Sequence, residues 1–178
     1  NIEENEEGVD AGQAYKMYAE GVKALVVDDN DINLKVAKGL LEKYKITVDL
    51  ADSGELCITK SDLDKYDVIL MDHMMPDMDG VETFEKLRQS SKYNSTTPVL
   101  LVTANAVMQI RQELMSKGFD GYVSKPIDTK VLEKELLKVL PSDKVNIIME
   151  NEMENTTSSV QFFDNMDFKL ALSKVGVD

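Results

Sequence analysis

The chain alternates between short apolar runs and longer segments in which apolar residues recur at helical spacing. Residues 24–27 are too few for a helix and rich in valine, so they are predicted to form a strand buried on both faces of a parallel sheet. Similar runs recur at residues 47–51, 68–71, 99–102 and 121–124. The pattern therefore predicts five strands along the chain.

Helical segments separate and follow these strands. The first spans residues 32–44, with Leu34 and Leu41 on its apolar face. Ser53 is the expected N-cap of a second helix, and a third begins near Gly80. Two more helices are predicted at residues 110–117 and 129–139. Because right-handed crossovers place helices over both sides of a parallel sheet, the predicted fold is α/β, a doubly wound five-stranded parallel sheet with helices on both faces.

Composition narrows the class of protein. A chain of 178 residues has room for one domain of ordinary size plus tails. The formal net charge of −13 argues against a surface that neutralises phosphate backbones, so no nucleic-acid partner is expected. No apolar run approaches the roughly eighteen residues of a membrane span. The single cysteine, Cys57, fits a reducing compartment and is predicted to be a small core residue rather than a reactive thiol.

Polar residues follow the predicted strands where the chain leaves the sheet. Asp28 and Asp29 come after the first strand and Asp72 after the third. Thr103 follows the fourth strand and Lys125 the fifth. In doubly wound sheets ligands bind beyond the carboxyl ends of the strands, so these side chains are expected to converge at one edge. Each of them alone has an alternative interpretation as a capping or turn residue, but their shared placement favours function.

The chemistry of these residues suits phosphoryl transfer. Three carboxylates within a few ångströms repel each other and need a hard cation, and oxygen ligands with open water positions suit Mg²⁺. A carboxylate that stays accessible beside such a metal can attack a phosphoryl group. Lys125 would supply a cation and Thr103 a hydroxyl donor for the charge on the phosphoryl oxygens.

A resemblance to a known family lies in four segments: Val26–Asn30, Met71–Gly80, Thr103–Ala104 and Lys125–Pro126. In order, spacing and strand context they resemble the response-regulator receiver domains of two-component signalling. The resemblance covers about residues 22–140. It implies a flavodoxin-like sheet with strand order 2-1-3-4-5 and a receiver domain over residues 22–141.

This resemblance implies a role for each site residue. Asp72 would be the phosphoacceptor, supplied by a phosphohistidine on a histidine kinase or on a histidine phosphotransfer domain. Mg²⁺ would be held by Asp28, Asp29 and Asp72, with the backbone carbonyl of Met74 as a further ligand. Lys125 would contact the phosphoryl group.

The resemblance also implies a conformational switch. Thr103 would move toward the phosphoryl group and Tyr122 would turn inward with it. The bond from Lys125 to Pro126 is expected to be cis. Phosphorylation would then bias the face formed by the fourth helix, the fifth strand and the fifth helix. An alternative interpretation of Tyr122 is a half-buried aromatic residue on an edge strand.

Three rival interpretations fit the sequence less well. The stretch from Asp77 to Gly80 mimics the nucleophile motif of haloacid-dehalogenase-type phosphatases, but Pro76 blocks a strand that would lead to it. A pseudo-receiver, meaning an interaction module without the chemistry, would lack an acidic or lysine position, and none is missing. His73 is the only histidine and directly follows Asp72, so it is predicted to be a loop residue rather than a phosphodonor, which would lie on a helix.

The flanks and the first residue, which is not Met, point to a longer parent protein. Residues 1–21 are predicted to be an acidic linker that turns helical near Tyr15 to Tyr18. Residues 142–178 read as a linker followed by helical spacing from Met166, which weakly resembles the start of a histidine phosphotransfer domain. We therefore predict a cytoplasmic receiver from a hybrid sensor histidine kinase, with any membrane anchor in the parent. A response regulator with a removed effector domain is the alternative.

Overall fold

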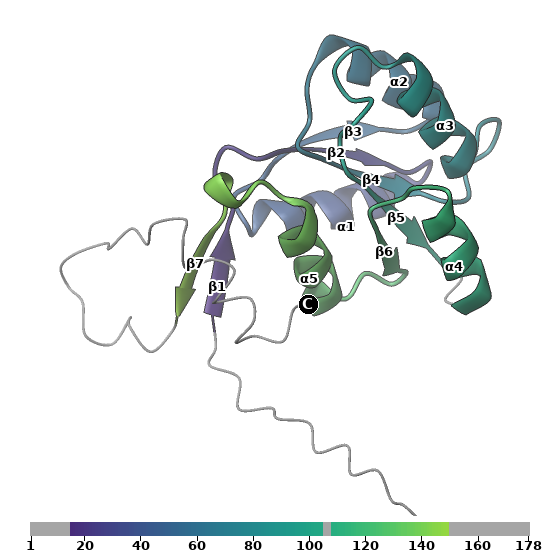
Figure 1. Ribbon diagram of the computed structural model, residues 1–178. Helices are drawn as coiled ribbons and strands as arrows, with labels where there is room; N and C mark the ends of the chain where they lie inside the picture. Colours follow the sequence, from purple (N-terminus) through teal and green to yellow (C-terminus); the bar gives the residue numbers. More distant parts are fainter. Residues whose placement is uncertain (1–14, 105–107, 150–178) are drawn as a thin grey trace, which may run out of the picture. The chain divides into compact units, whose positions relative to one another are not determined.

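A computed structural model of the protein describes residues 15–104 and 108–149. Tyr18–Val145 form one compact unit that contains a five-stranded sheet (Figure 1). A separate two-stranded sheet pairs β1 (Tyr15–Tyr18) with β7 (Asn146–Met149). In the described part of the chain, no helix combines the length and the apolar character that a membrane crossing requires.

The five-stranded sheet has the predicted topology. Its strands are β2 (Lys23–Val27), β3 (Thr47–Ala51), β4 (Val68–Asp72), β5 (Val99–Thr103) and β6 (Gly121–Ser124). All neighbours run parallel, in the order β3-β2-β4-β5-β6. Counted within this sheet alone, the order is 2-1-3-4-5, so the predicted flavodoxin-like topology is confirmed.

Helices cover both faces of the sheet, as predicted. In the described ranges these are α1 (Asp31–Glu42), α2 (Gly54–Leu63), α3 (Gly80–Ser90), α4 (Met108–Ser116) and α5 (Thr129–Val139), followed by a 3-10 turn, η1 (Ser142–Lys144). In Figure 1, α1 and α5 lie on one side of the sheet and α2 and α3 on the other. The central strands β2, β4 and β5 therefore pack between two helical layers.

One large core lies on the side of α2 and α3. Side chains alternate between the two faces of each strand, and Leu25 and Ile69 point to this side. There they pack with Cys57 of α2, Phe84 of α3 and Leu114 of α4. Cys57 is fully buried, and this burial raises the pKa of its thiol to about 12. The predicted role of Cys57 as a core residue is confirmed.

Side-chain caps determine where four of the helices begin. Oxygens of Asn30, Ser53, Asp79 and Asp128 accept hydrogen bonds from backbone N–H groups in the first turns of α1, α2, α3 and α5. The sequence predicted Ser53 in this role. Each cap of this kind contributes about 0.5–2 kcal/mol to stability. Because each of these helices follows a parallel strand, the caps hold their N-termini at the edge where the strands end.

The loop after β4 is packed tightly against the end of that strand. The backbone N–H of Gly80 donates to the carbonyl oxygen of His73 at 3.0 Å. A Cβ at Gly80 would lie 2.2 Å from the carbonyl oxygen of Asp72, so this approach requires glycine. Asp77 lies within the loop with a φ of 64°. No strand leads into Asp77, which removes the structural basis of a phosphatase-type motif there.

The prediction of a helical turn at Tyr15 to Tyr18 is wrong. This segment is strand β1, and its partner β7 lies within residues that were predicted to be a linker. So short a segment has little helical stability of its own, and a partner at the other end of the chain decides its conformation. The acidic run at the start of the chain and the predicted helix from Met166 lie outside the described residues.

Two glycine substitutions test the packing of this loop. Gly80→Ala is expected to lower the free energy of unfolding by about 1–3 kcal/mol, because the new Cβ has no room beside Asp72. Gly39→Ala is the matched control, since Gly39 is exposed on α1 and a Cβ there would meet no atom within 4 Å. Alanine at Gly39 is expected to raise the free energy of unfolding by up to about 1 kcal/mol. Urea unfolding followed by circular dichroism measures both, and effects of equal sign would contradict this account.

Candidate functional site

The polar residues that follow the strands meet at one edge of the sheet. In the parallel register Val27 lies beside Met71 and Asp72 beside Val102, so the ends of β2, β4 and β5 are level. Asp28 and Asp72 are buried, with exposed fractions of 4% and 5%. Asp29, next to Asp28, is exposed. The sheet therefore places two buried acids and one exposed acid together, as expected from the sequence.

The three acids form a compact cluster of oxygen donors. One carboxylate oxygen from each of Asp28, Asp29 and Asp72 lies within 4.8 Å of the other two. Like charges this close repel each other unless a cation lies among them. A donor set made only of oxygens fits a hard divalent cation such as Mg²⁺.

Lys125 supplies a positive charge to the same cluster. Its Nζ lies 2.6 Å from Oδ2 of Asp28 and 2.8 Å from Oδ1 of Asp72. Burial lowers the pKa of Lys125, but hydrogen bonds to Asp28 and Asp72 outweigh burial, so its pKa is raised. For Asp72, burial outweighs the lowering effect of Lys125, and the pKa of this carboxyl is raised. The ammonium group of Lys125 is therefore charged at neutral pH and bridges two buried acids.

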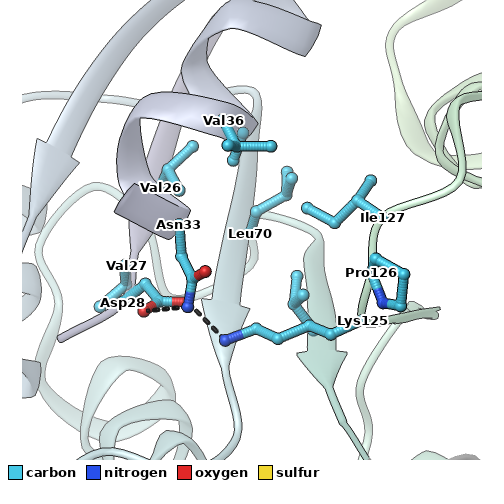
Figure 2. Close-up of a pocket in the computed structure, with 11 residues that line it drawn as sticks. Val26, Val27, Asp28, Asn33, Val36, Leu70, Lys125, Pro126 and Ile127 are labelled. Carbon is cyan, nitrogen blue, oxygen red and sulfur yellow. Dashed lines mark hydrogen bonds and ion pairs between the residues drawn. The ribbon is translucent and has the colours of Figure 1, made fainter. Parts of the chain in front are cut away.

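Asp28 is also held by α1. Its Oδ1 accepts hydrogen bonds from the backbone N–H of Asn30 at 2.9 Å and from Nδ2 of Asn33 at 3.0 Å. Dashed lines in Figure 2 mark the contacts of Asp28 with the amide of Asn33 and with the ammonium of Lys125. Asn33 is absent from the set of polar residues predicted at the strand ends, because it lies on a helix. An asparagine in the first helical turn after an acidic pair is the signal that would have found it.

Thr103 lies at the end of β5, beside the loop that follows Asp72. It is 1% exposed, and its Oγ1 is 3.5 Å from Nδ1 of His73. His73 is half-buried in the loop directly after β4, so the prediction that it is a loop residue is confirmed. The backbone N–H of Lys125 donates to the carbonyl of Thr103 at 2.8 Å, which ties the loop after β6 to β5.

The remaining predicted residues lie around this cluster. Tyr122 is half-buried in β6, in register with Leu101 of β5. Met74 follows Asp72 by two residues in the loop, and it is 71% exposed. The peptide bond between Lys125 and Pro126 is cis, as expected. The geometry leaves the roles of Tyr122 and Met74 as predictions.

A mainly apolar cavity of about 210 Å³ adjoins the acidic cluster. The sheet contributes Val26 and Leu70, α1 contributes Asn33 and Val36, and the loop after β6 contributes Pro126 and Ile127 (Figure 2). Ile32 and Val36 are 70% and 51% exposed on α1. An apolar surface therefore borders the charged site.

Known proteins share both this sequence pattern and this fold. The family described as "Response regulator receiver domain" matches residues 24–137. The signal transduction histidine-protein kinase BarA of Escherichia coli (strain K12) is 37% identical over 122 residues. That match covers 68% of this chain but only 13% of BarA, so the chain spans a small part of the length of this relative.

Solved structures agree with the sequence matches. The chemotaxis protein CheY4 of Vibrio cholerae has a TM-score of 0.61 and 31% identity, covering 67% of this chain and 98% of that chain. The receiver domain of the sensor histidine kinase PA1611 from Pseudomonas aeruginosa PAO1 has a TM-score of 0.61 and 28% identity. The match covers 67% of this chain and 97% of that chain. The PA1611 structure carries a magnesium ion coordinated in its active site cleft.

Replacement of the bridging lysine tests the electrostatics of the site. Lys125→Met is expected to lower the free energy of unfolding at neutral pH, in the absence of divalent cations, by about 1–3 kcal/mol, because Asp28 and Asp72 lose their shared cation. The loss is expected to shrink as the pH falls and Asp72, whose pKa is already raised, becomes protonated. Chemical unfolding of wild type and Lys125→Met at a series of pH values measures this difference in the free energy of unfolding. A loss that stays constant as the carboxyls protonate would show that Lys125 stabilises the fold by packing alone.

Proposed function

Since the chain belongs to the response-regulator receiver family of two-component signalling, we propose that Asp72 accepts a phosphoryl group from a phosphohistidine. One observation carries this proposal. Three carboxylates and the ammonium of Lys125 converge at the carboxyl edge of the sheet, with Lys125 2.8 Å from Asp72. Such a site combines a nucleophile with a fixed positive charge for the transferring group.

The proposed reaction exchanges one bond for another. A carboxylate oxygen of Asp72 forms a bond to phosphorus while the phosphorus–nitrogen bond of the phosphohistidine breaks. The electron pair of that bond stays on the imidazole nitrogen, which takes up a proton. Lys125 lies close enough to donate to an oxygen of the phosphoryl group once it is attached to Asp72.

Asp28, Asp29 and Asp72 would hold Mg²⁺, together with the backbone carbonyl of Met74. The family resemblance supplies Met74, and the clustered oxygens of the three acids support the rest of the set. When bound, Mg²⁺ offsets the negative charge of the carboxylates and of the phosphoryl oxygens. Without a cation, this charge would repel an incoming phosphoryl group.

We further propose that Thr103 and Tyr122 form the conformational switch. Thr103 carries its hydroxyl at the end of β5, where it could turn to a phosphoryl oxygen on Asp72. Tyr122 is half-buried on β6, the edge strand next to β5, so a modest rotation would change its burial. The output would then be a population shift at the face of α4, β6 and α5.

The parent protein is proposed to be a hybrid sensor histidine kinase. The support is the identity of 37% to a histidine kinase of which this chain covers 13%. A response regulator with a different effector domain is the alternative. A pseudo-receiver is disfavoured, because Asp28, Asp29, Asp72, Thr103 and Lys125 are all present.

The phosphohistidine domain of the partner is proposed to dock on α1. Val36 is exposed there and lines the cavity together with Pro126 and Ile127, and Ile32 is exposed one turn earlier on the same helix. A donor has to bring its phosphohistidine within bonding distance of Asp72, so it must cover this adjacent apolar surface. Burial of exposed apolar side chains would provide the favourable free energy of docking.

The phosphoacceptor is tested with a small-molecule phosphodonor. Wild type and Asp72→Asn are incubated with acetyl phosphate and Mg²⁺, and intact mass is read. Wild type is expected to gain one phosphoryl group, and both the substitution and a chelator are expected to abolish the gain. A folded wild-type protein that gains no phosphoryl group and also fails to bind beryllofluoride would favour the pseudo-receiver.

The docking surface is tested by separating partner transfer from chemistry. Ile32→Ala is expected to slow transfer from a phosphorylated histidine phosphotransfer protein about tenfold or more, since a buried anchor contributes at least about 1.4 kcal/mol to binding. Its rate with acetyl phosphate should stay at the wild-type value. Leu63→Ala is the control, because Leu63 is 78% exposed at the end of α2, away from the site edge. Equal rates for Ile32→Ala and Leu63→Ala would place the docking surface elsewhere.

A further inference from the structure

The two carboxylate oxygens of Asp28 have different kinds of partner. Oδ1 accepts from the backbone N–H of Asn30 at 2.9 Å and from Nδ2 of Asn33 at 3.0 Å. Oδ2 accepts from Nζ of Lys125 at 2.6 Å. Neutral donors therefore hold one oxygen and a cation holds the other.

The neutral donors are fixed by the start of α1. Asn30 is the N-cap of this helix, and its side-chain oxygen accepts from the backbone N–H groups of Ile32 at 2.8 Å and Asn33 at 3.3 Å. Asn33 lies in the first turn, so its side chain projects from a capped and hydrogen-bonded backbone. Lys125, by contrast, reaches Asp28 with a long side chain and also contacts Asp72.

The partner of Oδ2 is therefore the one that can change. Lys125 must share Oδ2 of Asp28 with any divalent cation held by the three acids, or give it up. Asp28 is 4% exposed, so water has little access to replace a lost donor at Oδ1. Without the amide of Asn33, Oδ1 would keep only the backbone N–H of Asn30 as a donor. The less restrained carboxylate could then rotate about its Cβ–Cγ bond and turn Oδ2 away from the cluster.

We propose that Asn33 is a positioning residue for the cation site. Together with the backbone N–H of Asn30, its amide keeps Oδ1 of Asp28 bound to the start of α1, so that Oδ2 stays on the side of Lys125 and Asp72 while the cation beside it changes. The orientation of the amide follows from chemistry, because a carboxylate accepts hydrogen bonds and only Nδ2 of Asn33 can donate one. This inference rests on the proposed function, in which these acids hold Mg²⁺.

The expected effect is on cation affinity rather than on the chemical step. Groups that orient a metal ligand typically change metal affinity by about 10–100-fold when they are removed. We expect Asn33→Ala and Asn33→Leu each to weaken Mg²⁺ binding about tenfold or more. The alanine enlarges the neighbouring cavity and the leucine fills it, so a common effect isolates the lost hydrogen bond.

The experiment titrates Mg²⁺ into wild type, both Asn33 variants and Lys35→Ala, and follows backbone amide NMR shifts. Lys35 is exposed on the same helix, and its substitution should leave Mg²⁺ affinity unchanged. Phosphorylation by acetyl phosphate is then measured across Mg²⁺ concentrations. The Asn33 variants should need more Mg²⁺ and should approach the wild-type rate at saturation. If the Asn33 variants need more Mg²⁺ but reach the wild-type rate at saturation, Asn33 positions the cation site. A general structural defect would lower the rate at every Mg²⁺ concentration.

The possible outcomes separate this inference from the proposed function. Wild-type Mg²⁺ affinity in either folded Asn33 variant would overturn the positioning role while phosphorylation of Asp72 stands. A low rate that excess Mg²⁺ does not restore would also overturn it. If wild type itself binds no Mg²⁺, the proposed function fails and this inference fails with it. If one variant does not fold, the other decides by the same criterion.

Discussion

Lys125 donates to two buried carboxylates, those of Asp28 and Asp72, across the edge of the sheet where the strands end. Each acid alone would be costly to bury with its charge, and together they repel each other. The positive charge of Lys125 reduces the repulsion between Asp28 and Asp72. The cluster also contains an oxygen of Asp29, so three carboxylates share one lysine. The folded protein can therefore bury these acids, and the site keeps a net negative charge that attracts a divalent cation. The alignment of parallel strands is what allows one lysine to reach both acids.

At the opposite edge of the sheet, where the strands begin, a buried asparagine joins three segments of backbone through neutral hydrogen bonds. Asn94 is fully buried, and its amide nitrogen donates to the carbonyls of Ser61 and Asp64, both at 2.7 Å. Its oxygen accepts from the backbone N–H of Tyr66 at 2.9 Å. These neutral partners cannot be exchanged without leaving a buried polar group unpaired, which costs about 1–3 kcal/mol. Asn94 is thus a fixed neutral support at this edge, whereas the acidic cluster at the other edge holds its lysine through contacts that a divalent cation can change.

Several features were accessible from the sequence because their signals are local. The parallel strands and intervening helices follow from short apolar runs and helical periodicity, and Ser53 was recognisable as a cap. Each polar residue at a strand end is visible in the sequence by itself, and the topology of a parallel sheet predicts that these residues converge. Strand β1 was mispredicted because its conformation depends on β7, far along the chain. Asn33 was missed because it lies on a helix rather than at a strand end, and its contact with Asp28 is one between side chains.

The sequence by itself determined the fold class, the order of the strands through its family motifs, and the identity of the acids and the lysine at the site. Periodicity, strand ends and motif spacing are properties of neighbouring residues, so they can be read without coordinates. Only the tertiary structure decided which oxygen of Asp28 each donor takes, how close Thr103 lies to His73, and where an apolar cavity adjoins the site. These features depend on distances between side chains from different elements, and packing alone sets those distances.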